Sequence, residues 1–229
     1  MPQNRFYVDD PLLPNSRPFL ENNEWHHLVH VMRMQEGEEV ELVNGKGTLA
    51  VAKVAALEKR RAQLHVLHAT KENQKPPQII LGIPILRPSK LEWIIEKGTE
   101  LGVDAFWIYK SELGEKKGIP IERLSALTIA AMKQSGRLFL PHIELLSDFS
   151  ELFRTEATIF FGDAQGGALL ENLSFPTLFI TGPEGGYTAK ERAMLLEKGK
   201  RVRLNPHILR AESAPIAAAS ILSYLNIRD

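Results

Sequence analysis

The chain has 229 residues, enough for one large domain or two small ones with a buried core. Its 44% hydrophobic and 24% charged residues are typical of a globular protein. Because 28 basic residues balance 28 acidic ones, the chain lacks the net positive charge that is typical of nucleic-acid-binding proteins. The absence of cysteine excludes disulfides and thiolate metal sites. Neither a signal-peptide pattern nor an apolar run of about 18 residues is present, so we expect a cytoplasmic protein without a transmembrane helix.

The first 72 residues contain short strand patterns with close turns between them. Residues 44–47 (Asn-Gly-Lys-Gly) lie between two of these segments and are a hairpin signal. The expected strands are residues 5–8, 39–43, 48–54 and 62–67. This pattern predicts a small β-barrel-like domain over residues 1–72.

One helix is expected within this domain. Asn22 or Asn23 can cap its start, it runs to about Met34, and Gly37 ends it. Its spacing of apolar residues predicts an inward-facing side. The expected inward side chains are Trp25, Leu28, Val29, Val31 and Met32.

Residues 73–77 end in two prolines and are expected to form a linker. Strand and helix patterns then alternate over residues 78–229, which predicts a parallel sheet flanked by helices. The expected strands are residues 78–84, 105–109, 157–161, 177–180 and 201–204. The expected helices are residues 89–101, 120–135, 148–153, 188–198 and 211–225.

A glycine-rich loop follows the strand at residues 177–180. Residues 182–186 read Gly-Pro-Glu-Gly-Gly, and Thr188 with Glu191 then forms an S/T-x-x-E capping box that predicts a helix start. In open α/β sheets, ligands bind at this edge, outside the carboxyl ends of the strands. A tight turn is the alternative, but three glycines and a proline in five residues favour a ligand loop.

Two more segments follow strands and can help to enclose a ligand. Residues 204–214 lead into a helix rich in small residues, and residues 161–167 carry three glycines. Taken alone, residues 204–214 are better explained by an ordinary helix start, and residues 161–167 are only a weak signal for a ligand site.

Several other kinds of site lack support. The glycine loop matches neither G-x-G-x-x-G nor a Walker A motif, and no G-x-S-x-G is present. His26 and His30 are four residues apart, but the Glu of H-E-x-x-H and a third ligand are missing, so no metal site is expected.

Taken together, these motifs resemble a known family. Residues 180–186 followed by 208–214 (Ile-Leu-Arg-Ala-Glu-Ser-Ala) resemble the C-terminal signature of the SPOUT superfamily of S-adenosylmethionine (SAM)-dependent RNA methyltransferases. Within it, the match is to the ribosomal RNA small-subunit methyltransferase E family. Further segments of that family are resembled, in the same order along the chain, by residues 30–34, 90–103 and 131–137. The resemblance therefore covers nearly the whole chain.

The resemblance implies a PUA-like β-barrel domain over residues 1–72 and an α/β domain with a trefoil knot over residues 78–229. It implies a homodimer that binds SAM. The implied activity is methylation of N3 of one uridine near the 3′ end of 16S rRNA, either as naked rRNA or within the small ribosomal subunit.

The chain departs from the family at four positions. Asn205, His207, Ser213 and Lys133 stand where the family commonly has Gly, Arg, Thr and Glu. Serine keeps the hydroxyl group, and Asn tolerates a positive φ better than most residues. Histidine for arginine removes a constant charge and a bidentate donor.

The resemblance also implies the residues of the site. Glu212 is the first candidate for the base that removes the uridine N3 proton, and His207 is the second. A structural alternative for Glu212 is a carboxylate that stabilises a helix N-terminus. Arg210 and Arg137 are expected to contact substrate or to stabilise developing negative charge on uracil.

Two larger sets complete the expected site. The residues expected to bind SAM are Phe161, Gly162, Ile180, Thr181, Gly182, Pro183, Glu184, Gly185, Gly186, Leu204, Asn205, Ile208, Leu209, Ser213 and Ala214. The residues expected to contact RNA through salt-sensitive phosphate interactions are Arg5, Arg33, Lys59, Arg60, Arg61 and Arg137.

Two other functions remain open on the sequence. One is a 2′-O-ribose RNA methyltransferase of the same superfamily. The other is a non-catalytic RNA-binding protein for ribosome assembly, which the altered Asn205 and His207 would favour.

Overall fold

The computed structural model describes most of the chain, and two of the five residues of the predicted linker, 74–75, lie outside the described part. The described residues are 4–73, 76–115, 118–167 and 173–227. They form two compact units, which divide after residue 75. The first unit also takes in residues 129–140 from the second half of the chain.

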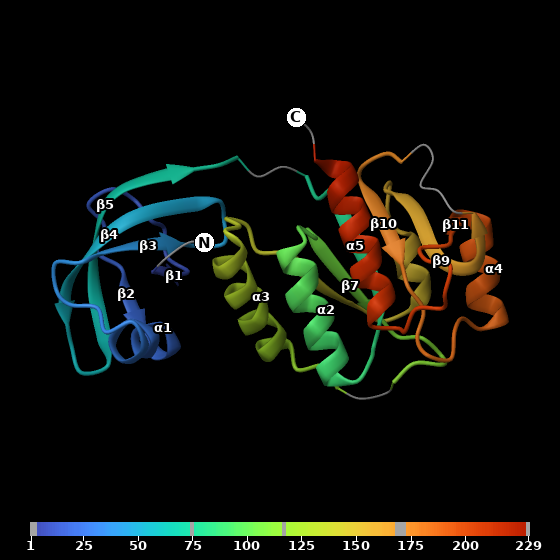
Figure 1. The fold of residues 1–229 in the computed structure, drawn as a ribbon, viewed down its shortest axis with the longest axis horizontal. Helices are drawn as coiled ribbons and strands as arrows, with labels where there is room; N and C mark the ends of the chain where they lie inside the picture. The colour runs from blue at the N-terminus through green and yellow to red at the C-terminus, as the bar shows by residue number, and fades with distance from the viewer. Residues whose placement is uncertain (1–3, 74–75, 116–117, 168–172, 228–229) are drawn as a thin grey trace. The chain divides into compact units, whose positions relative to one another are not determined.

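The first unit is built on a five-stranded sheet with the order β1-β3-β4-β5-β2 (Figure 1). The four predicted strands are confirmed, but β4 and β5 are longer than expected, and β2 was not predicted. The strands are β1 (Arg5–Tyr7), β2 (Phe19–Glu21), β3 (Glu39–Val43), β4 (Thr48–Leu57) and β5 (Arg61–Lys71). Alternate side chains of these strands, including Leu42, Val54 and Leu64, form the buried core of this unit.

The predicted helix of the first unit is shorter and changes its winding. It consists of α1 (Asn22–His26) followed by a π-helical turn η1 (His27–Val31). Its N-cap residue is Glu21 rather than the predicted Asn22 or Asn23. The wider turn shifts side chains around the axis relative to an α-helix. Leu28 is fully buried, whereas Val31 and Met32, predicted to face inward, are 58% and 37% exposed.

Residues 129–140 pack against the predicted hairpin. Lys46 forms an isolated antiparallel bridge with Phe139, and the ring of Phe139 occupies the space next to Gly47, which has a φ of +89°. A side chain at Gly47 would therefore be both strained and blocked. Lys133, one of the departures from the family, forms an ion pair with Glu24 at 2.5 Å.

The second unit contains a six-stranded parallel sheet with the order β11-β9-β10-β6-β7-β8 (Figure 1). This confirms the parallel sheet expected from strand–helix alternation. The strands are β6 (Ile79–Pro84), β7 (Ala105–Tyr109), β8 (His142–Leu146), β9 (Thr158–Gly167), β10 (Thr177–Ile180) and β11 (Lys200–Val202). β8 was not predicted, and residues 162–167, expected to form a loop, extend β9.

Helices cover both faces of this sheet and give it three layers. Helices α2 (Pro88–Glu100) and α5 (Ser213–Asn226) contact each other and pack on one face, whereas α4 (Ala189–Lys198) and the 3-10 turn η2 (Phe149–Phe153) pack on the other. Helix α3 (Ile121–Ser135) completes the helices of the described residues. Among these helices, none is long and apolar enough to span a membrane.

The close packing of α2 on the sheet requires a glycine at position 98. A Cβ atom at Gly98 would lie 2.6 Å from the ring of Phe106 in β7. We expect Gly98→Val to lower the free energy of unfolding by about 1–3 kcal/mol, because it overfills a closely packed core. Calorimetric melting measures the loss. Gly118→Val is the control, since nothing lies within 4 Å of a Cβ there, and an equal loss in both variants would contradict the packing argument.

Candidate functional site

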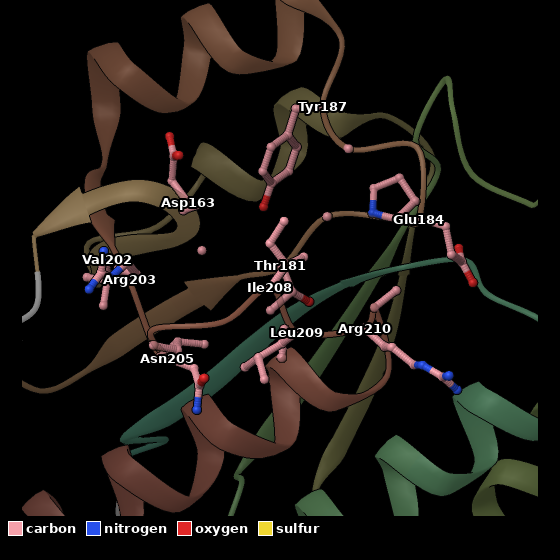
Figure 2. A pocket seen from close by; sticks show the side chains of 18 of the residues that line it. Asp163, Thr181, Glu184, Tyr187, Val202, Arg203, Asn205, Ile208, Leu209 and Arg210 are labelled. Atoms are coloured by element: carbon pink, nitrogen blue, oxygen red, sulfur yellow. The ribbon is translucent and has the colours of Figure 1, made fainter.

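A cavity of about 690 Å³ lies in the second unit, where strands β9, β10 and β11 end (Figure 2). Three chain segments line it, together with one residue from α2 and one from α4. The lining residues are Lys90, Gly162, Asp163, Ala164, Thr181, Gly182, Pro183, Glu184, Gly186, Tyr187, Arg192, Val202, Arg203, Leu204, Asn205, His207, Ile208, Leu209, Arg210, Ala211 and Ala214. Parallel α/β sheets bind ligands at this edge, so the cavity is the candidate site.

Residues 181–186 form the wall that follows β10. The N–H of Thr181 donates to the carbonyl of Gly82 at 2.9 Å, and the hydroxyl of Tyr109 donates to the carbonyl of Thr181 at 2.7 Å. The loop then turns tightly, with a hydrogen bond from the N–H of Gly186 to the carbonyl of Pro183 at 2.9 Å and a φ of +73° at Gly186. This wall is therefore held in one conformation by the sheet beneath it.

Tyr187 supports the same wall from below. Its ring lies 3.1 Å from the position of a Cβ atom at Gly182, and its hydroxyl donates to the carbonyl of Ile180 at 3.3 Å. The close contact explains why residue 182 is a glycine. Burial raises the pKa of Tyr187, so its hydroxyl keeps the proton that it donates.

The predicted capping box is confirmed at the start of α4. The hydroxyl of Thr188 accepts from the N–H of Glu191 at 3.2 Å, and the carboxylate of Glu191 accepts from the N–H of Thr188 at 2.8 Å. The second carboxylate oxygen of Glu191 accepts from the N–H of Glu112 at 3.3 Å. This helix start is thus capped by its own side chains rather than left open for an anion.

Residues 204–211 form a second wall, between β11 and α5. The side-chain oxygen of Asn205 accepts from the N–H of His207 at 2.9 Å, which is an Asx-turn. Asn205 does not have a positive φ. The ability of asparagine to adopt a positive φ therefore does not explain this residue. Ile208 is 91% exposed beside the cavity.

The third wall comes from the end of β9. Asp163 accepts a hydrogen bond from the guanidinium of Arg192 at 2.9 Å and another from the N–H of Gln165 at 2.9 Å. Its side chain is only 5% exposed. The ion pair joins β9 to α4 at the cavity.

Two glutamates share one lysine at Glu184, which lies on the opposite side of the cavity from Asp163 in Figure 2. The ammonium of Lys90 lies 2.8 Å from Glu184 Oε1 and 2.8 Å from Glu212 Oε2. Interaction with Lys90 lowers the pKa of both glutamates, and interaction with Glu184 and then Glu212 raises the pKa of Lys90. Both carboxylates are therefore ionised at neutral pH.

Most of the residues predicted to bind SAM line the cavity, but four of them do not, and neither does the predicted base Glu212. Phe161 and Ile180 point into the core, and Gly185 packs against Leu113. Glu212 and Ser213 lie next to lining residues at the start of α5 without lining the cavity themselves.

Eight lining residues were not among the predicted site residues. They are Lys90, Asp163, Ala164, Tyr187, Arg192, Val202, Arg203 and Ala211. Only Asp163 carried a usable signal, because it directly follows the strand residues of a glycine-bearing segment. Among the described residues, no cluster of His, Asp or Glu is arranged to hold a metal ion.

The residues predicted to contact RNA all belong to the first unit. Lys59 and Arg60 are exposed in the turn between β4 and β5, and Arg33 is exposed with a φ of +55°. Arg5 is different, because it pairs with Glu41 at 2.8 Å and its side chain is 9% exposed. We therefore remove Arg5 from the proposed phosphate-contacting set.

The two remaining arginines of that set are held by neighbours. Arg61 pairs with Glu58 at 2.8 Å and stacks over the ring of Phe19. Arg137 is partly buried, and it is not among the residues that line the cavity, where a contact with uracil was expected. Arg61 remains exposed, so it stays in the proposed set.

Two family models match the chain. An RNA methyltransferase domain matches residues 73–223, and an RNA methyltransferase PUA domain matches residues 20–67. These matches identify the two parts of the chain as an α/β domain with a parallel sheet and a small PUA-like domain before it.

Individual relatives agree with these matches. The chain is 33% identical to a ribosomal RNA small subunit methyltransferase E from Bacillus subtilis, over 88% of this chain and 87% of the relative. A crystal structure of a ribosomal RNA small subunit methyltransferase E from Neisseria gonorrhoeae, bound to S-adenosyl methionine, is 30% identical, with a TM-score of 0.86 over 98% of each chain. A probable rRNA-methyltransferase from Porphyromonas gingivalis is 27% identical, with a TM-score of 0.84 over 98% of each chain.

Proposed function

The chain belongs to the ribosomal RNA small subunit methyltransferase E family, and we propose that it transfers a methyl group from SAM to N3 of a uridine in 16S rRNA. The target is the family's uridine near the 3′ end of that RNA. One observation carries the proposal: residues from both family segments, 180–186 and 208–214, line a single cavity at the ends of parallel strands.

The cavity has the size and chemistry that SAM requires. Its volume of about 690 Å³ is within the usual range for small-molecule sites. Val202, Leu204 and Leu209 offer an apolar surface for the adenine ring. When bound, SAM supplies a methyl group whose bond to sulfur breaks as its bond to N3 forms.

The protein must also handle the proton that uridine N3 carries at neutral pH. We assign its removal to Glu212, from which it passes to water, with His207 as the second candidate. The lowered pKa of Glu212 makes this carboxylate a weak base. Arg210, two residues earlier and lining the cavity, would therefore stabilise the negative charge that develops on the uracil ring.

This assignment predicts the pH dependence of the reaction. A carboxylate that is already ionised removes the proton from neutral uridine, so kcat/KM should be flat between about pH 6 and 8. In Glu212→Gln only ionised uridine reacts. The variant should lose about 10²–10⁴-fold at pH 6 and then gain about tenfold per pH unit. A tenfold rise per pH unit in the wild-type protein would show that Glu212 is not the proton acceptor.

We propose that the first domain holds the RNA. Arg33, Lys59, Arg60, Arg61 and Arg137 provide the positive charge for contacts with phosphates. The substrate is 16S rRNA, as naked RNA or within the small ribosomal subunit, and the proposed location is the cytoplasm. Binding should weaken as salt concentration rises, because phosphate contacts release counterions.

We also propose that the second domain is knotted and dimeric, as in the SPOUT superfamily. The trefoil knot would bring together the chain segments that line the cavity. Apolar residues exposed at the end of α5, Tyr224, Leu225 and Ile227, support a homodimer, since exposed apolar patches mark interaction surfaces.

Mass spectrometry of nucleosides tests the proposed function. The purified protein, SAM and small subunits from a strain without the gene should give 3-methyluridine in 16S rRNA. A 2′-O-methylated nucleoside would contradict the base specificity, and the absence of any methylation would contradict the activity.

A further inference from the structure

Lys90 is a residue of the cavity that contacts both family segments at once. It lies in the first turn of α2, whereas Glu184 belongs to residues 181–186 and Glu212 immediately precedes α5. Its ammonium is 2.8 Å from an oxygen of each carboxylate. A single side chain therefore joins three elements that are distant in sequence.

A second lysine on the same helix shows what is particular about this arrangement. Lys97 also lies 2.8 Å from two carboxylates, those of Glu96 and Glu100. Both partners of Lys97 are on α2 itself, and none of the three residues lines the cavity. Lys90 thus connects separate parts of the cavity wall through its two carboxylate partners, whereas Lys97 connects only residues of its own helix.

The contact between Lys90 and Glu212 is an ion pair to a buried oxygen. Lys90 donates a hydrogen bond to Glu184. Oε2 of Glu212 is buried, and the ammonium of Lys90 lies 2.8 Å from it. Buried charged groups are normally paired. Lys90 therefore compensates the charge of this buried carboxylate oxygen.

We propose that Lys90 is a positioning residue for methyl transfer, which holds the two family segments together at the cavity through its contacts with Glu184 and Glu212. This role rests on the proposed function, because it assumes that Glu212 receives the uridine N3 proton. The interaction with Glu184 would position the loop that contacts SAM.

The electrostatics of the cluster agree with this role. The charged groups that face Glu212 are Lys90 from α2, Glu184 from the loop and Arg210 from its own turn. Lys90 is the largest cause of the lowered pKa of Glu212. Without it, the two carboxylates would repel each other, and the pKa of Glu212 would rise.

Four variants test the proposal: Lys90→Met, Lys90→Arg, Glu184→Gln and the control Lys97→Met. In Lys90→Met, the Kd for SAM, measured by calorimetry, should rise about fivefold, and the acidic limb of the pH profile of kcat/KM should move to higher pH. Lys90→Arg should restore both values. Glu184→Gln should weaken SAM binding and leave the acidic limb in place, because Lys90 still faces Glu212.

Lys97→Met should leave the Kd, the pH profile and the melting temperature as in the wild-type protein. An unchanged Kd and pH profile in Lys90→Met would overturn the proposal, and so would equal effects of Lys90→Met and Lys97→Met. If Lys90→Met does not fold, Lys90→Arg and Glu184→Gln still decide it: a Kd unchanged by Glu184→Gln would overturn it. If the wild-type protein forms no 3-methyluridine, the proposed function fails, whereas SAM calorimetry still tests whether Lys90 holds the cavity walls.

Discussion

Arg210→Ala is expected to lower kcat/KM for rRNA methylation by about 10²–10³-fold while the Kd for SAM stays within about twofold. The reason is that Glu212, the proposed base, is a weak one. Lys90 keeps the pKa of Glu212 low, so proton removal from N3 leaves much of the negative charge on the uracil ring. A cation beside the ring then stabilises the transition state more than the bound substrate.

Arg210 is well placed and available for this role. It lines the cavity, it is exposed, and it has no ion pair or side-chain hydrogen bond within the described part of the chain. Its carbonyl accepts from the N–H groups of Ser213 and Ala214 at 2.9 and 3.0 Å, so the backbone that carries the guanidinium is fixed to the start of α5. Only the side chain has to adjust to the substrate.

Steady-state kinetics and SAM calorimetry measure the two expected effects separately. Arg210→Lys keeps the charge but loses the planar group of donors, so it should recover only part of the rate. Arg201→Ala is the control, since Arg201 is exposed in β11 and does not line the cavity. If the Kd for SAM rises in Arg210→Ala as much as kcat/KM falls, Arg210 is a cofactor ligand and not a group that acts on uracil.

The sequence predicted those structural features that depend only on residues close together in the chain. The capping box of Thr188 and Glu191 requires only the spacing of two residues, and the structure confirms both of its hydrogen bonds. The end of the helix predicted over residues 89–101 is also local, because the next residue, Gly102, has a φ of +88°, a conformation that glycine adopts freely. Continuous apolar runs likewise marked the central strands β6, β7 and β10.

The missed features depend on partners that are distant in the chain. Strands β2 and β8 are edge strands whose pairing partners, β5 and β7, define them more than their own composition does. The end of β9 is held as a strand by β11, so its glycines did not mark a loop. Lys90 was overlooked for the same reason, because only the folded chain brings it to Glu184 and Glu212.

The contact of Tyr187 with the cavity wall leads to the second large expected effect. Tyr187→Ala should lower the free energy of unfolding by about 2–3 kcal/mol, somewhat less than the loss of a fully buried ring, because Tyr187 is partly buried. The ring lies against Phe149 and Phe161, with centroids 6.4 and 6.3 Å away, and fills the space beneath Gly182. Its removal leaves a cavity directly under the loop that is proposed to contact SAM.

The same change should raise the Kd for SAM on the order of tenfold or more, since the loop at Gly182 loses its support and its fixed position. Tyr187→Phe separates the two contributions of this side chain. It keeps the ring and removes only the hydrogen bond to the carbonyl of Ile180, so it should cost about 0.5–1.5 kcal/mol and leave the Kd nearly unchanged. Calorimetric melting and SAM titration of both variants measure these effects. A Kd that rises equally in the two variants would show that the hydroxyl, rather than the ring, positions the wall.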